Sequence, residues 1–168
     1  MIILSTDPGL ANFGWSVIDS DTLSILDCGI TRTEASNSDG KRLSDIYNFT
    51  KGLFDRFDIE FVVYEQIYQG FRPGQTTQAL RVSKVIGLIE MLADERGIPV
   101  ASYTTQQIKK EVAGSGKSSK EEVEEAVGIV FNVEIPKSKN HMSDAIGAGL
   151  CFIRKRNQLI GGVPVATG

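Results

Sequence analysis

The stretch of sequence that decides the fold is residues 2–30, IILSTDPGLANFGWSVIDSDTLSILDCGI. It contains three short apolar runs, at residues 2–6, 13–19 and 24–30, with turn-forming residues between them. Short runs separated in this way predict three strands that pair in order as an antiparallel meander. The first run ends at Asp7, so a carboxylate stands where the first strand gives way to a turn.

Helix and strand patterns alternate in the rest of the chain. This mixture predicts an α/β fold, in which helices pack on both faces of a sheet. We expect one domain over residues 1–157 and a flexible tail over residues 158–168. The elements expected after the meander are a helix at 41–57, a strand at 61–64, a helix at 76–96, a strand at 99–103, a helix from Thr104 or Thr105 to 112, a helix from Ser118 or Ser119 that Pro136 ends, and a helix at 140–156.

Composition limits what the chain can be. Of its 168 residues 41% are hydrophobic and 23% charged, which is typical of an ordinary folded domain. Cys28 and Cys151 are too few and too far apart for a disulfide framework or a zinc cluster, so we interpret them as buried free thiols. The chain opens without a signal peptide and has no apolar stretch of membrane-spanning length. We therefore expect a cytoplasmic protein, in the host cytoplasm if the chain is viral.

The net charge of −3 does not exclude a nucleic-acid partner, because affinity for phosphates depends on where the cations lie. Basic residues cluster at 109–120, at 137–139 and at 154–156. The last cluster is interpreted as a solvated face. The first two clusters remain candidates for contact with phosphate groups.

Acidic residues far apart in the chain converge on one site. Asp7 ends the first apolar run and Glu65 ends the fourth, so neighbouring strands would bring the two carboxylates together at one edge of the sheet. Two such carboxylates repel each other unless a cation lies between them. His141 and Asp144 are three residues apart and share one face of the last helix. The pattern indicates a divalent metal site suited to phosphodiester hydrolysis.

Each of these residues also has a simpler interpretation. Asp7 before Pro-Gly can be an ordinary turn residue, and Asp144 can stabilise a helix N-terminus while His141 is merely exposed. The metal site is the better interpretation because the residues occur together and not singly.

In their order and spacing, several short motifs resemble the RuvC family of Holliday junction resolvases, over about residues 2–155. Each motif is weak by itself, but their combination is specific. The motifs are Asp7-Pro-Gly with Gly14 in the next strand, Glu65-Gln66, Gly114-Ser-Gly-Lys-Ser-Ser-Lys120, and His141-Met-Ser-Asp144-Ala. The short opening and the lack of a long basic tail are compatible with a phage-type member.

The resemblance implies an RNase H-like fold, with a mixed sheet of five strands, three antiparallel and then two parallel, and helices on both faces. It implies a metal-dependent endodeoxyribonuclease that nicks opposing strands of a four-way junction and leaves 5′-phosphate and 3′-hydroxyl ends. Asp7, Glu65 and Asp144 match the family's metal-binding acids, and His141 takes the place of a fourth ligand, which is Asp in many members. Two Mg²⁺ ions per site are expected, with Mn²⁺ as a substitute. Because imidazole suits Mn²⁺ better than Mg²⁺, we expect Mn²⁺ to support relatively stronger activity.

Residues for DNA contact and dimer formation follow from the same resemblance. Lys109 and Lys120 match positions that contact DNA near the scissile phosphate, and Lys117 belongs to the glycine-rich loop before Lys120. Tyr68 matches an aromatic residue at the junction centre, and Arg72 lies in the loop that follows it. The helix at 76–96, apolar on more than one face, matches the family's dimer-forming helix. Core packing is the simpler interpretation of Tyr68.

Other functions stay open on the sequence alone. The fold could belong to a broader nuclease of branched DNA or forks, because RNase H-like sites serve many substrates. A junction-binding protein with weak catalysis is a further class, although a repelling acidic cluster would not help a pure DNA binder. A nucleotide P-loop at residues 114–119 is disfavoured because the motif is incomplete and follows a helix. Actin-like ATPases share the opening turn but are much longer, with two domains.

Overall fold

The computed structural model of the chain describes residues 1–66, 76–134 and 140–159. Its sheet has the strand order β3-β2-β1-β4-β5. β1 pairs antiparallel with β2 and parallel with β4, β2 pairs antiparallel with β3, and β4 pairs parallel with β5. The meander and the mixed five-stranded sheet expected from the sequence are confirmed. The strands are β1 (Ile2–Pro8), β2 (Asn12–Asp19), β3 (Ser24–Arg32), β4 (Phe61–Gln66) and β5 (Val100–Thr104).

The helices begin close to where the sequence places them, because capping residues mark their starts. Thr104 and Ser119 each form a capping box, in which the side chain accepts from the third helical residue and that residue's side chain accepts in return. Gly114 ends α3 in the left-handed conformation that glycine favours. The helices are α1 (Asp39–Arg56), α2 (Thr76–Asp94), α3 (Thr105–Ala113), α4 (Lys120–Phe131) and α5 (Asn140–Leu159).

The last helix runs further than expected. α5 continues to Leu159, so residues 158 and 159, assigned to a flexible tail from the sequence, are helical. Residues 150–160 contain no glycine or proline, and Gln158 Nε2 donates to Glu111 Oε2 at 3.0 Å. The rest of the expected tail and the expected helix end at Pro136 lie outside the described residues.

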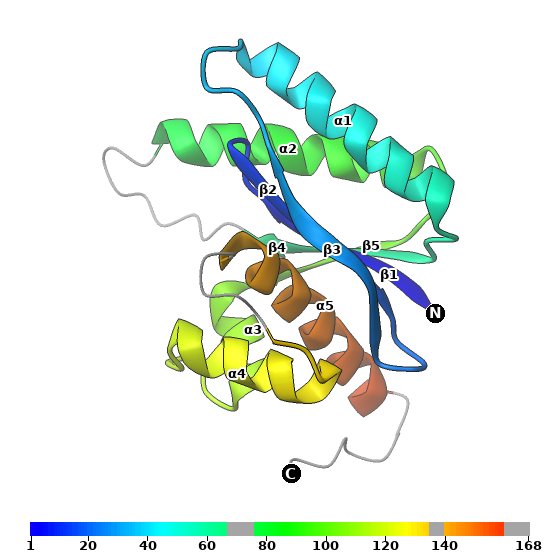
Figure 1. The fold of residues 1–168 in the computed structure, drawn as a ribbon, viewed down its shortest axis with the longest axis vertical. Coiled ribbons are helices and arrows are strands. Elements are labelled where there is room, and N and C mark those ends of the chain that lie inside the picture. Colours follow the sequence, from blue (N-terminus) through cyan, green and yellow to red (C-terminus); the bar gives the residue numbers. More distant parts are fainter. Residues whose placement is uncertain (67–75, 135–139, 160–168) are drawn as a thin grey trace.

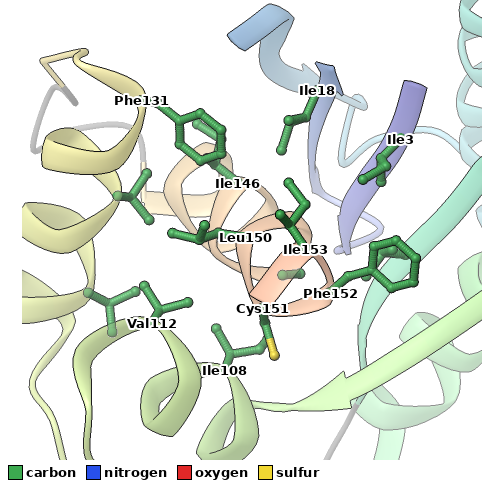
Figure 2. Packing of buried hydrophobic residues seen from close by; sticks show 14 of the residues in the cluster. Ile3, Ile18, Ile108, Val112, Phe131, Ile146, Leu150, Cys151, Phe152 and Ile153 are labelled. Carbon is green, nitrogen blue, oxygen red and sulfur yellow. The ribbon is translucent and has the colours of Figure 1, made fainter. Parts of the chain in front are cut away.

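Helices cover both faces of the sheet. In Figure 1, α1 and α2 lie on one side and α3, α4 and α5 on the other. Side chains alternate along each strand, so Leu4 packs with the α1 and α2 side and Ile3 with the α5 side. Figure 2 shows the core on the α5 side of the sheet, where Ile146, Leu150 and Ile153 of α5 lie among side chains from the sheet, α3 and α4.

Two glycines allow α5 to lie directly on the sheet. A Cβ atom at Gly14 of β2 would stand 2.0 Å from the backbone oxygen of His141. At Gly149 of α5 a Cβ atom would stand 2.6 Å from Ile18 Cδ1 and 2.7 Å from Ser5 Oγ. Side-chain Cβ atoms do not come so close to other heavy atoms, so the backbone contact at Gly14 requires glycine, whereas a larger residue at 149 would force the side chains of Ile18 and Ser5 to move. The first contact places the start of α5 against β2.

The structure tests two further expectations, that both cysteines are buried and that the helix after residue 76 is apolar on more than one face. Among the described residues neither cysteine forms a disulfide. The expected burial is confirmed for Cys151 and is wrong for Cys28, which is half-buried in β3. α2 buries Val85 and Ile89 against the sheet but leaves Leu80 60% exposed and Met91 48% exposed. The described helices include none with the length and apolar character needed to cross a membrane.

Candidate active site

Asp7 lies near the end of β1, on the face of the sheet that α5 covers. Side chains at positions 3, 5 and 7 share this face, and Ile3 packs there against α5. The carboxylate meets the first turn of α5, where His141 Nδ1 lies 2.5 Å from Asp7 Oδ2. The contact between Gly14 and the His141 backbone brings the imidazole to this position.

A second carboxylate completes a group that could hold a metal ion. Asp7, His141 and Asp144 each offer one ligand atom, and these atoms all lie within 4.8 Å of one another. The spacing of three residues on α5 puts His141 and Asp144 on the same side of the helix. Carboxylate oxygens with one imidazole nitrogen suit Mg²⁺, Mn²⁺ or another divalent cation.

Glu65 lies beside this group on the next strand. The parallel register pairs Thr6 with Tyr64, so Asp7 and Glu65 occupy equivalent positions on neighbouring strands. The pKa of Glu65 is raised to about 7, chiefly by burial and also by the nearby carboxylates of Asp7 and Asp144, while a hydrogen bond from Thr105 opposes the rise. Glu65 is therefore close enough to repel the other acids, as the sequence analysis anticipated.

Protein cations offset part of this negative charge. Lys120 Nζ donates to Asp144 Oδ2 at 2.7 Å. Burial raises the pKa of Asp144, and the hydrogen bond and charge of Lys120 oppose that rise. The hydrogen bond to Asp7 raises the pKa of His141, which favours the charged imidazolium. A metal ion would displace these positive charges, and its binding would release protons.

A pocket of about 230 Å³ opens next to the acidic group. Apolar and polar side chains line it together, and Lys109 and Lys120 are both among them. Two ammonium groups beside several carboxylates are what a phosphodiester and a metal ion would require together. The lining residues are Glu65, Thr105, Ile108, Lys109, Lys120, Val123 and Asp144.

The structure thus brings three of the four predicted metal ligands, Asp7, His141 and Asp144, within 4.8 Å of one another. Glu65, the fourth, is not part of this group but lines the adjoining pocket with Asp144 and two of the predicted DNA-contacting lysines. Lys117 is exposed in the loop before α4 and does not line the pocket. Tyr68 and Arg72 lie outside the described residues.

Sequence reasoning missed Thr105. Its Oγ1 donates to Glu65 Oε1 at 2.5 Å, although the sequence analysis considered Thr105 only as a possible helix cap. The signal was its place one residue after β5, beside the strand that carries Glu65.

The role of Arg154 was also missed, because it was assigned to a solvated face. Its Nη1 donates to the backbone oxygens of Glu111 at 2.6 Å and Val112 at 3.0 Å, which satisfies carbonyls at the end of α3. The basic cluster of residues 154–156 therefore contributes at least one side chain to structure and not only to the solvated surface.

The half-buried Glu65 carboxyl should lower the stability of the metal-free protein once it ionises. Its folded-state pKa of about 7 lies above the ordinary value of 4.5, so its contribution to stability is lost as pH rises from about 4.5 to 7. We expect Glu65→Gln, which cannot ionise, to stabilise the metal-free protein by about 1–3 kcal/mol at pH 8 and by little at pH 4.5. Urea unfolding in a chelator at both pH values measures this difference.

Glu90→Gln is the matched control, because it removes a carboxylate that contacts Tyr64 on the other side of the sheet. We expect the free energy of unfolding of Glu90→Gln to lack the pH-dependent gain expected of Glu65→Gln. An equal effect of Glu65→Gln at pH 4.5 and pH 8 would show that ionisation at position 65 does not govern stability.

Comparison with known proteins adds to this geometry. The family model described as "Crossover junction endodeoxyribonuclease RuvC" matches residues 3–152. A protein of that name from Pseudothermotoga lettingae is 31% identical over 160 residues, which cover 94% of this chain and 96% of the relative. The Thermus thermophilus RuvC structure superposes on this chain with a TM-score of 0.81 at 24% identity, and the match covers 96% of this chain and 97% of the Thermus chain. The same protein has been solved in complex with a Holliday junction substrate, with a TM-score of 0.80 at 24% identity and coverage of 96% of both chains.

Proposed function

The chain belongs to the RuvC family of crossover junction endodeoxyribonucleases, and from this premise we propose that it resolves four-way DNA junctions by paired, metal-dependent cuts. The observation that carries the proposal is the meeting of Asp7, His141 and Asp144 within 4.8 Å, beside Glu65 and a pocket that two lysines reach. A site of this kind is built for a cation and a phosphodiester together. We take residues 1–157 as the nuclease domain and the cytoplasm as its location.

The proposed cofactor is a pair of Mg²⁺ ions held by Asp7, Glu65, His141 and Asp144, with Mn²⁺ able to replace them. Three of these side chains offer ligand atoms within 4.8 Å of one another, and Glu65 is repelled by two of the acids. When bound, such ions supply Lewis-acid stabilisation of the phosphodiester and lower the pKa of bound water. The products would be a 5′-phosphate and a 3′-hydroxyl.

The chain's own cations would orient the DNA strand. Lys120 lies in the first turn of α4, and its ammonium reaches the Asp144 carboxylate. Lys109 lines the same pocket from α3. With the acids neutralised by metal, both ammonium groups are available for phosphate oxygens near the cut. Lys117, Tyr68 and Arg72 are proposed as further DNA contacts.

A synthetic junction assay tests this function. A labelled four-way junction, a fork and a linear duplex would be incubated with the protein in Mg²⁺. Paired, symmetrical nicks in the junction alone are expected. Equal cutting of the fork would indicate a broader branched-DNA nuclease, and binding without cutting in any cation would indicate a junction-binding protein.

The imidazole ligand gives a prediction about metal preference. We expect cleavage with either cation but a lower half-saturating concentration for Mn²⁺, because Mg²⁺ prefers oxygen ligands. Cleavage rates measured over a titration of each metal check this. A His141→Asp variant supplies the comparison, since an all-carboxylate site should narrow the difference between the cations. Equal dependence on the two metals in the unaltered protein would contradict the prediction.

We also propose that α2 forms a homodimer, which would supply the two active sites that paired cuts require. Leu80 and Met91 are the exposed apolar side chains of α2. We expect the double variant Leu80→Glu and Met91→Glu to be monomeric and to nick junction strands without pairing. Light scattering gives the mass, and a supercoiled cruciform plasmid separates single nicks from paired cuts.

Ile129→Glu is the matched control for this double variant. Ile129 is 67% exposed on α4, away from α2, so its replacement removes a comparable apolar side chain without touching the proposed interface. A dimer should persist. Persistence of the dimer in the Leu80 and Met91 double variant would rule out this use of α2.

A further inference from the structure

A hydrogen bond from Thr105 links the start of α3 to Glu65, the carboxylate beside Asp7, His141 and Asp144. Thr105 Oγ1 donates to Glu65 Oε1 at 2.5 Å, and both residues line the pocket beside Asp144. The two are 40 positions apart in the chain, so only the fold brings them together. Among the described residues, no hydrogen bond or ion pair engages the second oxygen, Oε2.

The backbone around Thr105 holds its hydroxyl in place. β5 pairs in parallel with β4, and the register sets Tyr103 beside Glu65 and Thr104 beside Gln66. α3 begins at the next residue, with no loop between strand and helix. Thr105 is therefore attached to the strand that neighbours Glu65.

The capping box adds a second constraint at the start of α3. Gln107 N donates to Thr104 Oγ1 at 3.3 Å, and Thr104 N donates to Gln107 Oε1 at 2.9 Å. These bonds fix the first turn of α3. The donor on Thr105 is thus preorganised before any ligand arrives.

The helix itself does not need the Thr105 hydroxyl. Thr104 and Gln107 already satisfy the capping positions, and Thr105 is exposed, so water could solvate its hydroxyl at little cost. A hydrogen bond to water-accessible groups adds little to stability. The contact matters more for the carboxylate, because it restrains a glutamate side chain with several rotatable bonds.

We infer that Thr105 is a positioning residue for Glu65: its hydroxyl holds Oε1 and presents Oε2 to a divalent cation. The inference rests on the proposed function, because it assigns Glu65 to a metal site. Partners that hold a metal ligand in this way are worth about 10- to 100-fold in metal affinity. Thr105 would thus contribute to cation binding without touching the metal.

Two substitutions separate positioning from packing. Thr105→Val keeps the shape of the side chain and removes the donor, whereas Thr105→Ser keeps the donor and removes a methyl group. Binding of Mn²⁺ to the DNA-free protein would be measured by electron paramagnetic resonance at fixed pH. The metal concentration that half-saturates junction cleavage would be measured in parallel, together with the melting temperature.

We expect Thr105→Val to weaken Mn²⁺ binding by about tenfold and Thr105→Ser by less than about threefold. The half-saturating metal concentration should rise by the same factor, with the rate at saturating metal nearly unchanged. The inference is overturned if Thr105→Val binds Mn²⁺ as tightly as the unaltered protein, or if both variants lose affinity and melting temperature equally. Absence of Mn²⁺ binding by the unaltered protein would instead contradict the proposed function.

Discussion

Asp7→Asn is expected to lower the rate of junction cleavage by about 10³-fold or more while leaving junction binding intact. Asp7 belongs to the candidate metal group: His141 Nδ1 lies 2.5 Å from its carboxylate, and the ligand atoms of Asp7, His141 and Asp144 all lie within 4.8 Å of one another. Asparagine has the same shape but no charge to hold a divalent cation. Loss of metal stabilisation worth several kcal/mol in the transition state corresponds to this factor in rate.

Junction binding should not fall with the cleavage rate. The acidic group repels DNA phosphates when no metal is bound, so removal of one charge should leave affinity equal or slightly higher. Single-turnover cleavage and fluorescence anisotropy, each in Mg²⁺ and in a chelator, measure the two quantities separately. Loss of both binding and cleavage would argue that Asp7 maintains the fold and not the chemistry.

Asp58→Asn is the matched control for charge. It removes one carboxylate from an exposed position in the connection between α1 and β4, with no partner among the hydrogen bonds and ion pairs of the described residues. The two variants have the same net charge. A difference in cleavage between them therefore reports the position of the carboxylate, since the overall field is unchanged.

The meander and the ends of its strands could be predicted from sequence because they depend on local patterns. Apolar runs of strand length end at Asp7 and Glu65, and the sequence predicted that their carboxylates meet if the two strands are neighbours, which the parallel pairing of β1 with β4 satisfies. The spacing of His141 and Asp144 fixes their common helical face. These local rules place two carboxylates at strand ends and two ligands on one helical face, but they do not determine how the helix meets the sheet.

Contacts between distant segments could not be predicted in this way. The Lys120–Asp144 ion pair and the Thr105–Glu65 hydrogen bond depend on how α3 and α4 pack beside α5, and no local period encodes that packing. The sequence indicated that Lys120 opens a helix, but not that its ammonium would reach a metal ligand. The extension of α5 was missed because a basic stretch resembles a helix end.

Gly14 shows how a residue without a side chain can determine the site. The resemblance singled out Gly14 by its position, but its physical role appears only in the packed structure. A Cβ atom there would stand 2.0 Å from the backbone oxygen of His141 and 2.5 Å from its carbonyl carbon. The obstacle is backbone and not the end of a flexible side chain, so β2 or the start of α5 would have to move.

Gly14→Ala is therefore expected to lower cleavage by about 100-fold or more and to destabilise the fold by about 1–3 kcal/mol. The shift required would displace His141, and with it Asp144, from Asp7. A misplacement of about 1 Å at a catalytic group costs roughly 10²-fold in rate. Weaker Mn²⁺ binding should accompany the loss, because the ligand atoms no longer converge.

Gly52→Ala separates this effect from the general consequences of replacing glycine. Gly52 lies within α1, and a Cβ atom there would meet nothing within 4 Å, so alanine should stabilise the helix by up to about 1 kcal/mol and leave cleavage unchanged. Cleavage rate, Mn²⁺ affinity and urea unfolding would be measured for both variants. If Gly14→Ala lost stability but kept full metal affinity, the close approach of α5 to β2 would serve the fold alone. Loss of metal affinity in Gly14→Ala under conditions where it remains folded would instead show that this backbone contact sets the geometry of the ligands.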